Sequence, residues 1–267
     1  MKVLICVKQV PDVSRFAHRD AAGRPPEDST PLAGNPVDKY ALEAAARLKD
    51  RDPETHMTAL SLGPRAAERV LRDSLALAAD EAFLLCDARL DGADSLAVSY
   101  ALSAAVRALE AKGGVFDIIF CGGQAADSDE GHTAPQLAEW LGRPHVSGAL
   151  VVEPDGARCK VSRETQAGVQ IVTVPRPCVI AVTKSAGECR YPDILRLMEA
   201  NRAEIPVLTA ADLPGLDLTK AGPQGSPTRQ EKLVPAPEKP GRIRIEETSD
   251  EASARELYRL LNAAAIL

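Results

Sequence analysis

The sequence is poor in aromatic residues and has neither a long apolar run nor an excess of positive charge. Aromatic side chains make up 3% of the 267 residues, while hydrophobic residues reach 45%. The core must therefore consist mostly of Ala, Val, Leu and Ile, as in α/β layers where Ala-rich helices lie close to strands. No stretch approaches the roughly 18 consecutive apolar residues of a membrane-spanning helix. A net charge of −6 argues against a nucleic-acid-binding protein, which needs a basic face.

The cysteines show no C-x-x-C pair and no metal-ligand spacing. They are Cys6, Cys86, Cys121, Cys159, Cys178 and Cys189. Several lie inside apolar runs, where a thiol acts as a small hydrophobe, and buried reduced thiols indicate a reducing compartment. The N-terminal apolar run is too short for the core of a signal peptide followed by a cleavage site. We therefore expect a cytoplasmic protein without a metal site.

Short apolar runs alternate with longer Ala/Leu-periodic stretches in the first half of the chain. The apolar runs predict buried strands at residues 2–7, 57–62, 82–86 and 116–121. The periodic stretches predict helices at residues 38–48, 66–79, 94–111 and 133–141. Asp94 or Ser95 is the expected N-cap of the third helix. This order predicts an α/β fold with a doubly wound, mostly parallel sheet.

The middle of the chain changes character. We expect its four β-like runs to form an antiparallel extension of the sheet: residues 149–153, 158–163, 169–174 and 178–183. After about Pro206 the periodicity fades, and residues 213–241 have the Pro, Gly and Lys content of an extended arm. Residues 249–267 predict an amphipathic helix, packed either on its own domain or on another chain. The expected domains are therefore residues 1–206, which bind a nucleotide, and residues 207–267, the C-terminal arm and helix.

The strand that ends at Cys121 is followed by a candidate ligand-binding loop. Ligands of open α/β sheets bind beyond the carboxyl ends of the strands. Gly122 and Gly123 let the backbone approach a ligand closely, and the helix that begins at Thr133 presents free N–H groups for a phosphate. The loop is either a nucleotide pocket or an ordinary strand–helix turn.

Motifs that define a particular chemistry are absent from the sequence. No G-x-G-x-x-G follows the first strand, and neither G-x-x-x-x-G-K-[ST] nor a nucleophile elbow occurs. The histidines have no Ser or Cys partner at motif spacing. Asp127 and Asp129 are expected to contact sugar hydroxyls or solvent rather than Mg²⁺. The residues alone indicate an α/β nucleotide-binding protein with a C-terminal arm.

Five stretches resemble the β subunit of electron-transfer flavoproteins. In chain order they are VKQVPD (7–12), NPVDKYALEAAARLKD (35–50), LSLGP (60–64), GGQAADSD (122–129) and VSRETQAGVQIVTVPRPCVIAVT (161–183). RYPDILRLMEA (190–200) follows where the family has its partner-recognition loop. Residues 165–167 depart from the family signature, which usually has further acidic or Gly residues there. The similarity covers nearly the whole chain.

The resemblance implies the small subunit of a heterodimer. The larger α subunit would carry a FAD that passes electrons to a dehydrogenase, such as an acyl-CoA dehydrogenase. Family β subunits hold either a structural AMP or, in electron-bifurcating members, a second FAD that meets NADH. Further partners implied for a bifurcating member are ferredoxin or flavodoxin. A different class of protein, a non-redox adenine-nucleotide sensor, is the alternative.

Two stretches favour the bifurcating type. Residues 92–98 resemble that group's Gly-x-Asp-Thr-x-Ala-Thr, although Val98 replaces a Thr, and residues 133–136 resemble its Val-Gly-Pro-Gln. Three residues depart from that group: Ser128, Glu130 and His132. We therefore expect FAD in this subunit, with AMP as the alternative in the same pocket, and NAD(H) as a substrate.

The resemblance also implies particular site residues. The expected cofactor-binding residues are Cys6, Asn35, Leu62, Asp94, Ser95, Gly122, Gly123, Gln124, Ala125, Asp127, Asp129, Gly131, His132 and Thr133. Asp94 and Ser95 are expected to face the isoalloxazine end. Glu164 resembles the glutamate that pairs with an arginine of the α subunit. Ile194, near Tyr191, stands at the tip of the recognition loop, where the family places a Leu anchor. No catalytic side chain is expected, because the flavin supplies the redox chemistry.

Overall fold

A sheet of nine strands organises the first of two units, Met1–Glu231 and Lys232–Leu267. The computed structural model describes residues 1–12, 31–229, 231 and 243–266. Within this part of the chain the strand order is β11-β5-β4-β1-β6-β10-β7-β8-β9. The strands are β1 Lys2–Cys6, β4 His56–Leu62, β5 Glu81–Leu85, β6 Ile118–Gly122, β7 His145–Asp155, β8 Arg158–Thr165, β9 Gly168–Pro175, β10 Cys178–Val182 and β11 Val207–Leu208.

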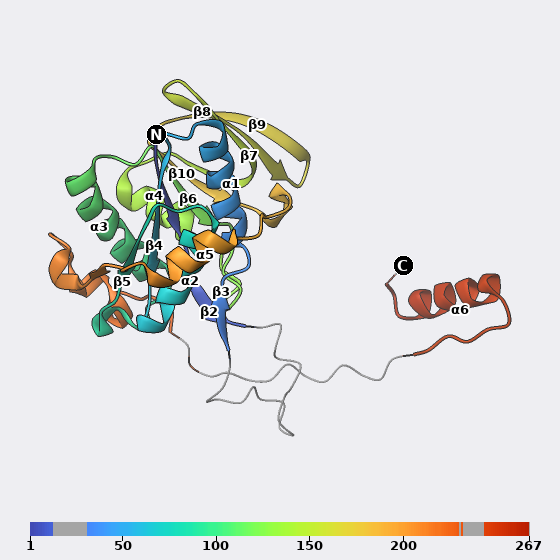
Figure 1. The fold of residues 1–267 in the computed structure, drawn as a ribbon. Coiled ribbons are helices and arrows are strands. Elements are labelled where there is room, and N and C mark those ends of the chain that lie inside the picture. The colour runs from blue at the N-terminus through green and yellow to red at the C-terminus, as the bar shows by residue number, and fades with distance from the viewer. Residues whose placement is uncertain (13–30, 230, 232–242, 267) are drawn as a thin grey trace. The chain divides into compact units, whose positions relative to one another are not determined.

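Helices cover both faces of the sheet (Figure 1). The helices of the first unit are α1 Asp38–Arg51, α2 Glu68–Leu77, α3 Ser95–Gly113, α4 Thr133–Leu141 and α5 Ile194–Arg202. One core cluster joins α1 and α2 to the sheet, and a second joins α3 and α4 to it. Alanines such as Ala45 and Ala105 are fully buried in these clusters. Their small side chains let the helices lie close to the strands, which explains how a core with so few aromatics is filled.

The doubly wound, mostly parallel sheet is confirmed, and so is an antiparallel extension, with one correction. Strands β7, β8 and β9 form antiparallel neighbours. The expectation is wrong for residues 178–183, because β10 lies between β6 and β7 and runs parallel to both. All of β10 is buried, as is usual for a parallel strand that is covered on both faces.

The segment that follows Pro206 is part of the first unit and packs on its sheet and helices. Strand β11 pairs with β5, and Leu213 and Ala221 are buried in the cluster around α3 and α4. Along the chain, the two compact units of the structure meet between Glu231 and Lys232, and the expected division of the chain at residue 206 stays a prediction. Part of the expected arm, residue 230 and residues 232–241, lies outside the described residues.

The second unit contains the expected amphipathic helix, α6 Asp250–Ala263. Ser249 caps it by accepting a hydrogen bond from the Ala252 N–H at 3.2 Å. Leu257 and Tyr258 of its apolar stripe are exposed, so the described residues of this unit supply no core for them. In the described part of the chain, no helix combines the length and the apolar character needed to cross a bilayer.

Candidate functional site

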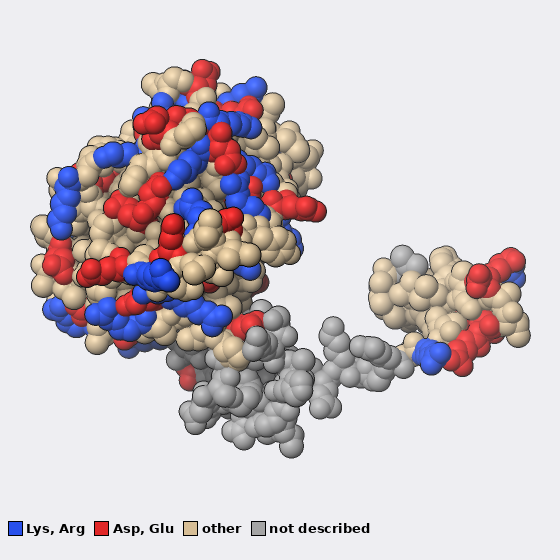
Figure 2. Space-filling model, in the orientation of Figure 1, with Lys and Arg blue, Asp and Glu red and all other residues tan. Residues whose placement is uncertain are grey.

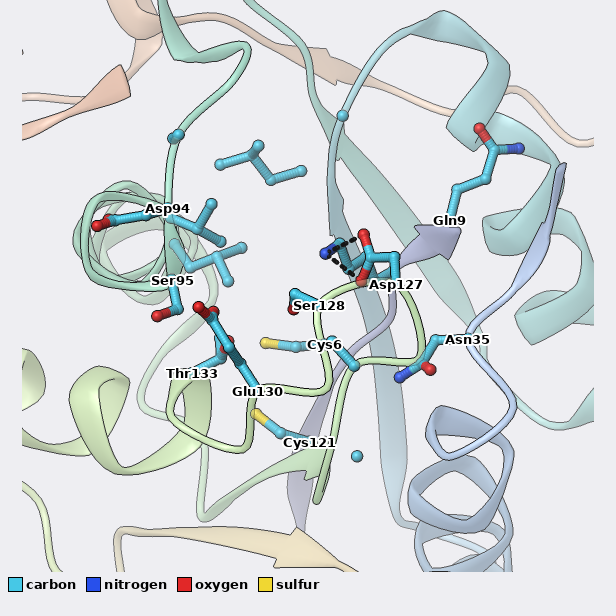
Figure 3. Close-up of a pocket in the computed structure, with 18 of the residues that line it drawn as sticks. Cys6, Gln9, Asn35, Asp94, Ser95, Cys121, Asp127, Ser128, Glu130 and Thr133 are labelled. Atoms are coloured by element: carbon cyan, nitrogen blue, oxygen red, sulfur yellow. Dashed lines mark hydrogen bonds and ion pairs between the residues drawn. The ribbon is translucent and has the colours of Figure 1, made fainter. Parts of the chain in front are cut away.

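A cavity of about 600 Å³ opens at the carboxyl ends of the central strands. It lies where the chain order of the sheet reverses, because β4 pairs with one edge of β1 and β6 with the other. Ligands of doubly wound sheets bind at such a switch point. Figure 3 shows Asn35 and Gln9 on one side of the cavity and Asp94 and Ser95, at the start of α3, on the other.

Most of the expected cofactor residues line this cavity: Cys6, Asn35, Leu62, Asp94, Ser95, Gly122, Gln124, Ala125, Asp127, Gly131 and Thr133. Three expected residues lie beside it instead. Gly123 donates its N–H to the Val182 carbonyl at 2.8 Å. Asp129, at a turn with φ 59°, accepts a hydrogen bond from the Gln124 side chain. His132 is exposed just before α4. Cofactor binding by these residues stays a prediction.

Asn35 ties the loop after β6 to the start of α1. Its Nδ2 donates to Asp38 Oδ1 at 2.7 Å and to the Gln124 carbonyl at 2.9 Å. Its Oδ1 accepts the Ala126 N–H at 3.1 Å. Because Asn35 is buried, each of these bonds is costly to break. The side chain therefore shapes the loop that lines the cavity.

Asp38 is a cavity-lining residue that the sequence reasoning missed. Its Oδ2 accepts the Lys8 N–H at 2.7 Å, and it also accepts a hydrogen bond from the Gly122 backbone. Burial raises the pKa of its carboxyl to about 7, although these bonds and the one from Asn35 lower it. An acidic residue in the first turn of a helix is ordinary, so nothing in the local sequence marks Asp38.

The position of the Asp38 side chain also explains why residue 122 is a glycine. A Cβ at Gly122 would collide with Asp38 Oδ1 and press on the Val37 and Asp38 backbone. The sequence reasoning assigned this glycine to a close approach by a ligand. The structure assigns it to a close approach by the buried carboxyl.

Asp94 caps α3, as expected. Its Oδ1 accepts the N–H groups of Leu96 and Ala97 at 3.1 and 3.0 Å. Its Oδ2 accepts the Thr228 N–H at 2.9 Å. Both oxygens are therefore engaged with backbone N–H groups, which offset the negative charge at this end of the cavity.

The floor and rim of the cavity differ in polarity. Cys6 and Cys121 are buried neighbours on β1 and β6. Their mutual hydrogen bond, together with burial, raises the pKa of Cys121 well above its usual range, so it remains a neutral thiol. At the rim, Lys8 Nζ forms an ion pair with Asp127 Oδ2 at 2.7 Å. No group of three or more potential metal ligands occurs in the described residues.

The expected partner-binding residues lie outside the cavity. Tyr191 and Ile194 are 94% and 75% exposed, and Leu195 and Met198 on α5 add to this apolar surface. Figure 2 shows acidic and basic side chains interspersed on the face that carries α5, with no large patch of either sign.

The chain around the exposed residues is firmly held. Arg190 binds Glu43 at 2.8 Å and Asp50 at 2.6 Å. Arg196 donates to the Leu75 and Ala79 carbonyls at 3.0 and 2.9 Å. The apolar side chains therefore project from a rigid support on α1 and α2.

Glu164 lies on β8, away from α5. Its Oε1 accepts the Thr183 hydroxyl at 2.5 Å. This bond and one from Ser185 lower the pKa of the Glu164 carboxyl, so it is ionised at neutral pH.

The fold and the cavity define a doubly wound α/β protein with a nucleotide-type site at its switch point. The profile of the electron transfer flavoprotein domain matches residues 27–213. The chain is 38% identical over 271 residues to the electron transfer flavoprotein subunit beta of Megasphaera elsdenii, with all of both chains covered. It is 36% identical to the subunit beta of Clostridium acetobutylicum, with 87% of each chain covered.

A third relative is the caffeyl-CoA reductase-Etf complex subunit CarD of Acetobacterium woodii, 32% identical with 90% of each chain covered. The chain belongs to the electron transfer flavoprotein family and corresponds to its β subunits. The resemblance found in the sequence is thereby confirmed, and the general role of the chain is electron transfer.

Asp38 should make stability depend on pH. The pKa of Asp38 is about 7 in the folded protein and 3.8 for an ordinary aspartate. The folded state therefore holds the proton more tightly, and this stabilisation is complete below pH 3.8. It is lost as the pH rises through the folded-state pKa of about 7. We expect the free energy of unfolding of the native chain, minus that of Asp38→Asn, to fall by about 2 to 4 kcal/mol between about pH 4 and pH 8.

Urea unfolding at a series of pH values measures this difference. Asp155→Asn, exposed at the end of β7, is the matched control and should give a much flatter difference curve. A curve for Asp38→Asn as flat as that of the control would contradict the raised pKa.

Proposed function

We propose that this chain is the β subunit of a heterodimeric, electron-bifurcating flavoprotein and that its cavity holds a whole FAD. The α subunit carries the FAD that delivers electrons to a dehydrogenase. NADH is the electron donor, and ferredoxin or flavodoxin is the second acceptor. The cysteines of the described residues are free thiols, which is typical of the reducing cytoplasm, where we place the protein.

The extent of the cavity is the observation that carries this proposal. Its lining continues from Asn35 and Gln124 to residues 91–95 at the start of α3. A nucleoside monophosphate held by the loop after β6 would leave the α3 end of the cavity unfilled. Gly92, Ala93 and Ser95 keep side-chain volume low at that end, as a bulky ring system requires.

The protein's own residues supply binding and electrostatics. The backbone N–H groups at the start of α4, beginning at Thr133, suit the phosphates. The start of α3 carries a positive partial charge, which favours an anionic reduced flavin, and Asp94 does not oppose it because both its oxygens accept N–H groups. When bound, the flavin accepts and donates the electrons.

The relatives support a partner that acts on CoA thioesters. CarD is named as a subunit of a caffeyl-CoA reductase complex, and the relative from Anaerotignum propionicum as an acryloyl-CoA reductase electron transfer subunit. We extend this to an acyl-CoA dehydrogenase-like partner. Glu164 is ionised and lies outside the cavity, which suits an ion pair with an arginine of the α subunit.

Filling the α3 end of the cavity should separate FAD from AMP. Ala93→Trp should abolish FAD binding in this subunit and leave AMP binding unchanged, because the side chain would occupy the space of the ring system. The measurement is the release and chromatographic counting of nucleotides from the denatured heterodimer, alongside reduction by NADH.

We expect two FAD per heterodimer in the native protein. The Ala93→Trp heterodimer should contain one FAD and should oxidise NADH more slowly. Ala88→Trp, exposed and outside the cavity lining, is the control and should retain both. One FAD and one AMP in the native heterodimer would refute the two-flavin proposal and leave a single-flavin carrier.

The exposed apolar side chains on α5 should bind the dehydrogenase. Exposed apolar groups on a rigid support are typical of partner contacts. Ile194→Ala should slow electron delivery to the dehydrogenase about tenfold, the effect of losing one anchor residue, with the flavin content unchanged. Stopped-flow transfer kinetics measure it. Val115→Ala, also exposed but far along the chain from α5, should transfer normally; equal rates for all three proteins would remove the anchor role.

The second unit should bind the α subunit. The first unit has its own core, whereas Leu257 and Tyr258 on α6 are exposed. Deleting residues 232–267 should leave the thermal unfolding of the first unit nearly unchanged and abolish co-purification with the α subunit. An intact complex after the deletion would show that α6 is not the contact.

A further inference from the structure

The stretch of residues 226–229 contributes Thr228 and Arg229 to the cavity wall. The sequence placed them in an extended arm, yet Thr228 and Arg229 line the cavity beside residues 91–95. They therefore lie at the α3 end of the cavity, which a mononucleotide held by the loop after β6 would leave unfilled.

Hydrogen bonds fix this segment to the start of α3. The Asp94 N–H donates to Ser226 Oγ at 2.9 Å, and the Thr228 N–H donates to Asp94 Oδ2 at 2.9 Å. The Ser226 hydroxyl donates to the Gly222 carbonyl at 2.8 Å. Gly222 has φ +59°, and a Cβ there would collide with the Arg89 carbonyl, so the turn before the segment is closely packed as well. These contacts hold the backbone as far as Thr228, directly before Arg229.

The charges around the cavity single out Arg229. Lys8 and Arg229 are the Lys and Arg residues that line it, among Asp91, Asp127, Glu130 and other acidic residues. Lys8 is paired with Asp127. Arg229 is exposed and, within the described part of the chain, forms no hydrogen bond or ion pair. Its guanidinium is therefore available to a ligand.

We infer that Arg229 binds the portion of a dinucleotide that extends beyond its AMP half, and that it thereby distinguishes FAD from AMP. This inference rests on the proposed function, because it takes the ligand to be FAD. A guanidinium donates hydrogen bonds to the carbonyl oxygens of an isoalloxazine ring. Its positive charge stabilises the reduced, anionic flavin more than the neutral oxidised flavin.

The test compares two probes, FAD and AMP, on the full-length chain. Arg229→Gln should weaken FAD binding about fivefold, as expected for one exposed charged contact, and should leave AMP binding unchanged. FAD fluorescence quenching and calorimetry with AMP measure the two affinities. Arg229→Lys, which keeps the charge, should retain more of the FAD affinity than Arg229→Gln. Lys220→Gln, exposed a few residues before this segment and outside the cavity lining, is the matched control and should bind both probes normally.

A second measurement tests the effect of the Arg229 charge on the flavin. The reduction potential of the bound FAD should fall in Arg229→Gln, because the anionic reduced form loses more stabilisation than the oxidised form. Equal weakening of FAD and AMP, or unchanged FAD affinity and potential, would overturn the role of Arg229 and leave the proposed function standing. A native chain that binds AMP but no FAD would overturn the proposed function and this inference together.

Discussion

The buried hydrogen bonds of Asn35 and Asp38 hold the site together. They join the end of β1, the start of α1 and the loop after β6, and single bonds among them span up to 91 residues of sequence. Each buried group left unpaired would cost about 1–3 kcal/mol. The loop that lines the cavity owes its course to these bonds, and Gly122 is required because a larger residue would displace the Asp38 carboxyl.

Contacts within the protein reduce the negative charge around the cavity. The chain carries a net charge of −6, and several acidic residues line the cavity. The pKa of Asp38 is raised to about 7, which reduces the charge that this carboxyl carries at neutral pH. Backbone N–H groups donate hydrogen bonds to the Asp94 carboxylate. Asp127 forms an ion pair with Lys8. The N-termini of α3 and α4 and the Arg229 guanidinium then contribute the positive potential at the cavity.

The cavity and the exposed apolar surface of α5 lie on separate parts of the fold. The cavity lies at the carboxyl ends of the central strands, whereas the exposed apolar residues of α5 are supported by α1 and α2. The α6 helix belongs to the second unit, Lys232–Leu267. Ile194 on α5 is not among the residues that line the cavity.

Local patterns by themselves determined β1, β4, β5, β6 and α1–α4, because apolar periodicity and the cap at Asp94 depend only on neighbours in sequence. The family resemblance was visible in the sequence as well, and most of the cofactor residues expected from it line the cavity. Tertiary structure alone decided the direction of β10, the burial of Asp38 and the place of residues 226–229. Each depends on partners distant in sequence: β10 on pairing with β6 and β7, Asp38 on Gly122, and Thr228 on Asp94. Local sequence does not encode which distant groups meet, because that follows from how the whole sheet closes around its core.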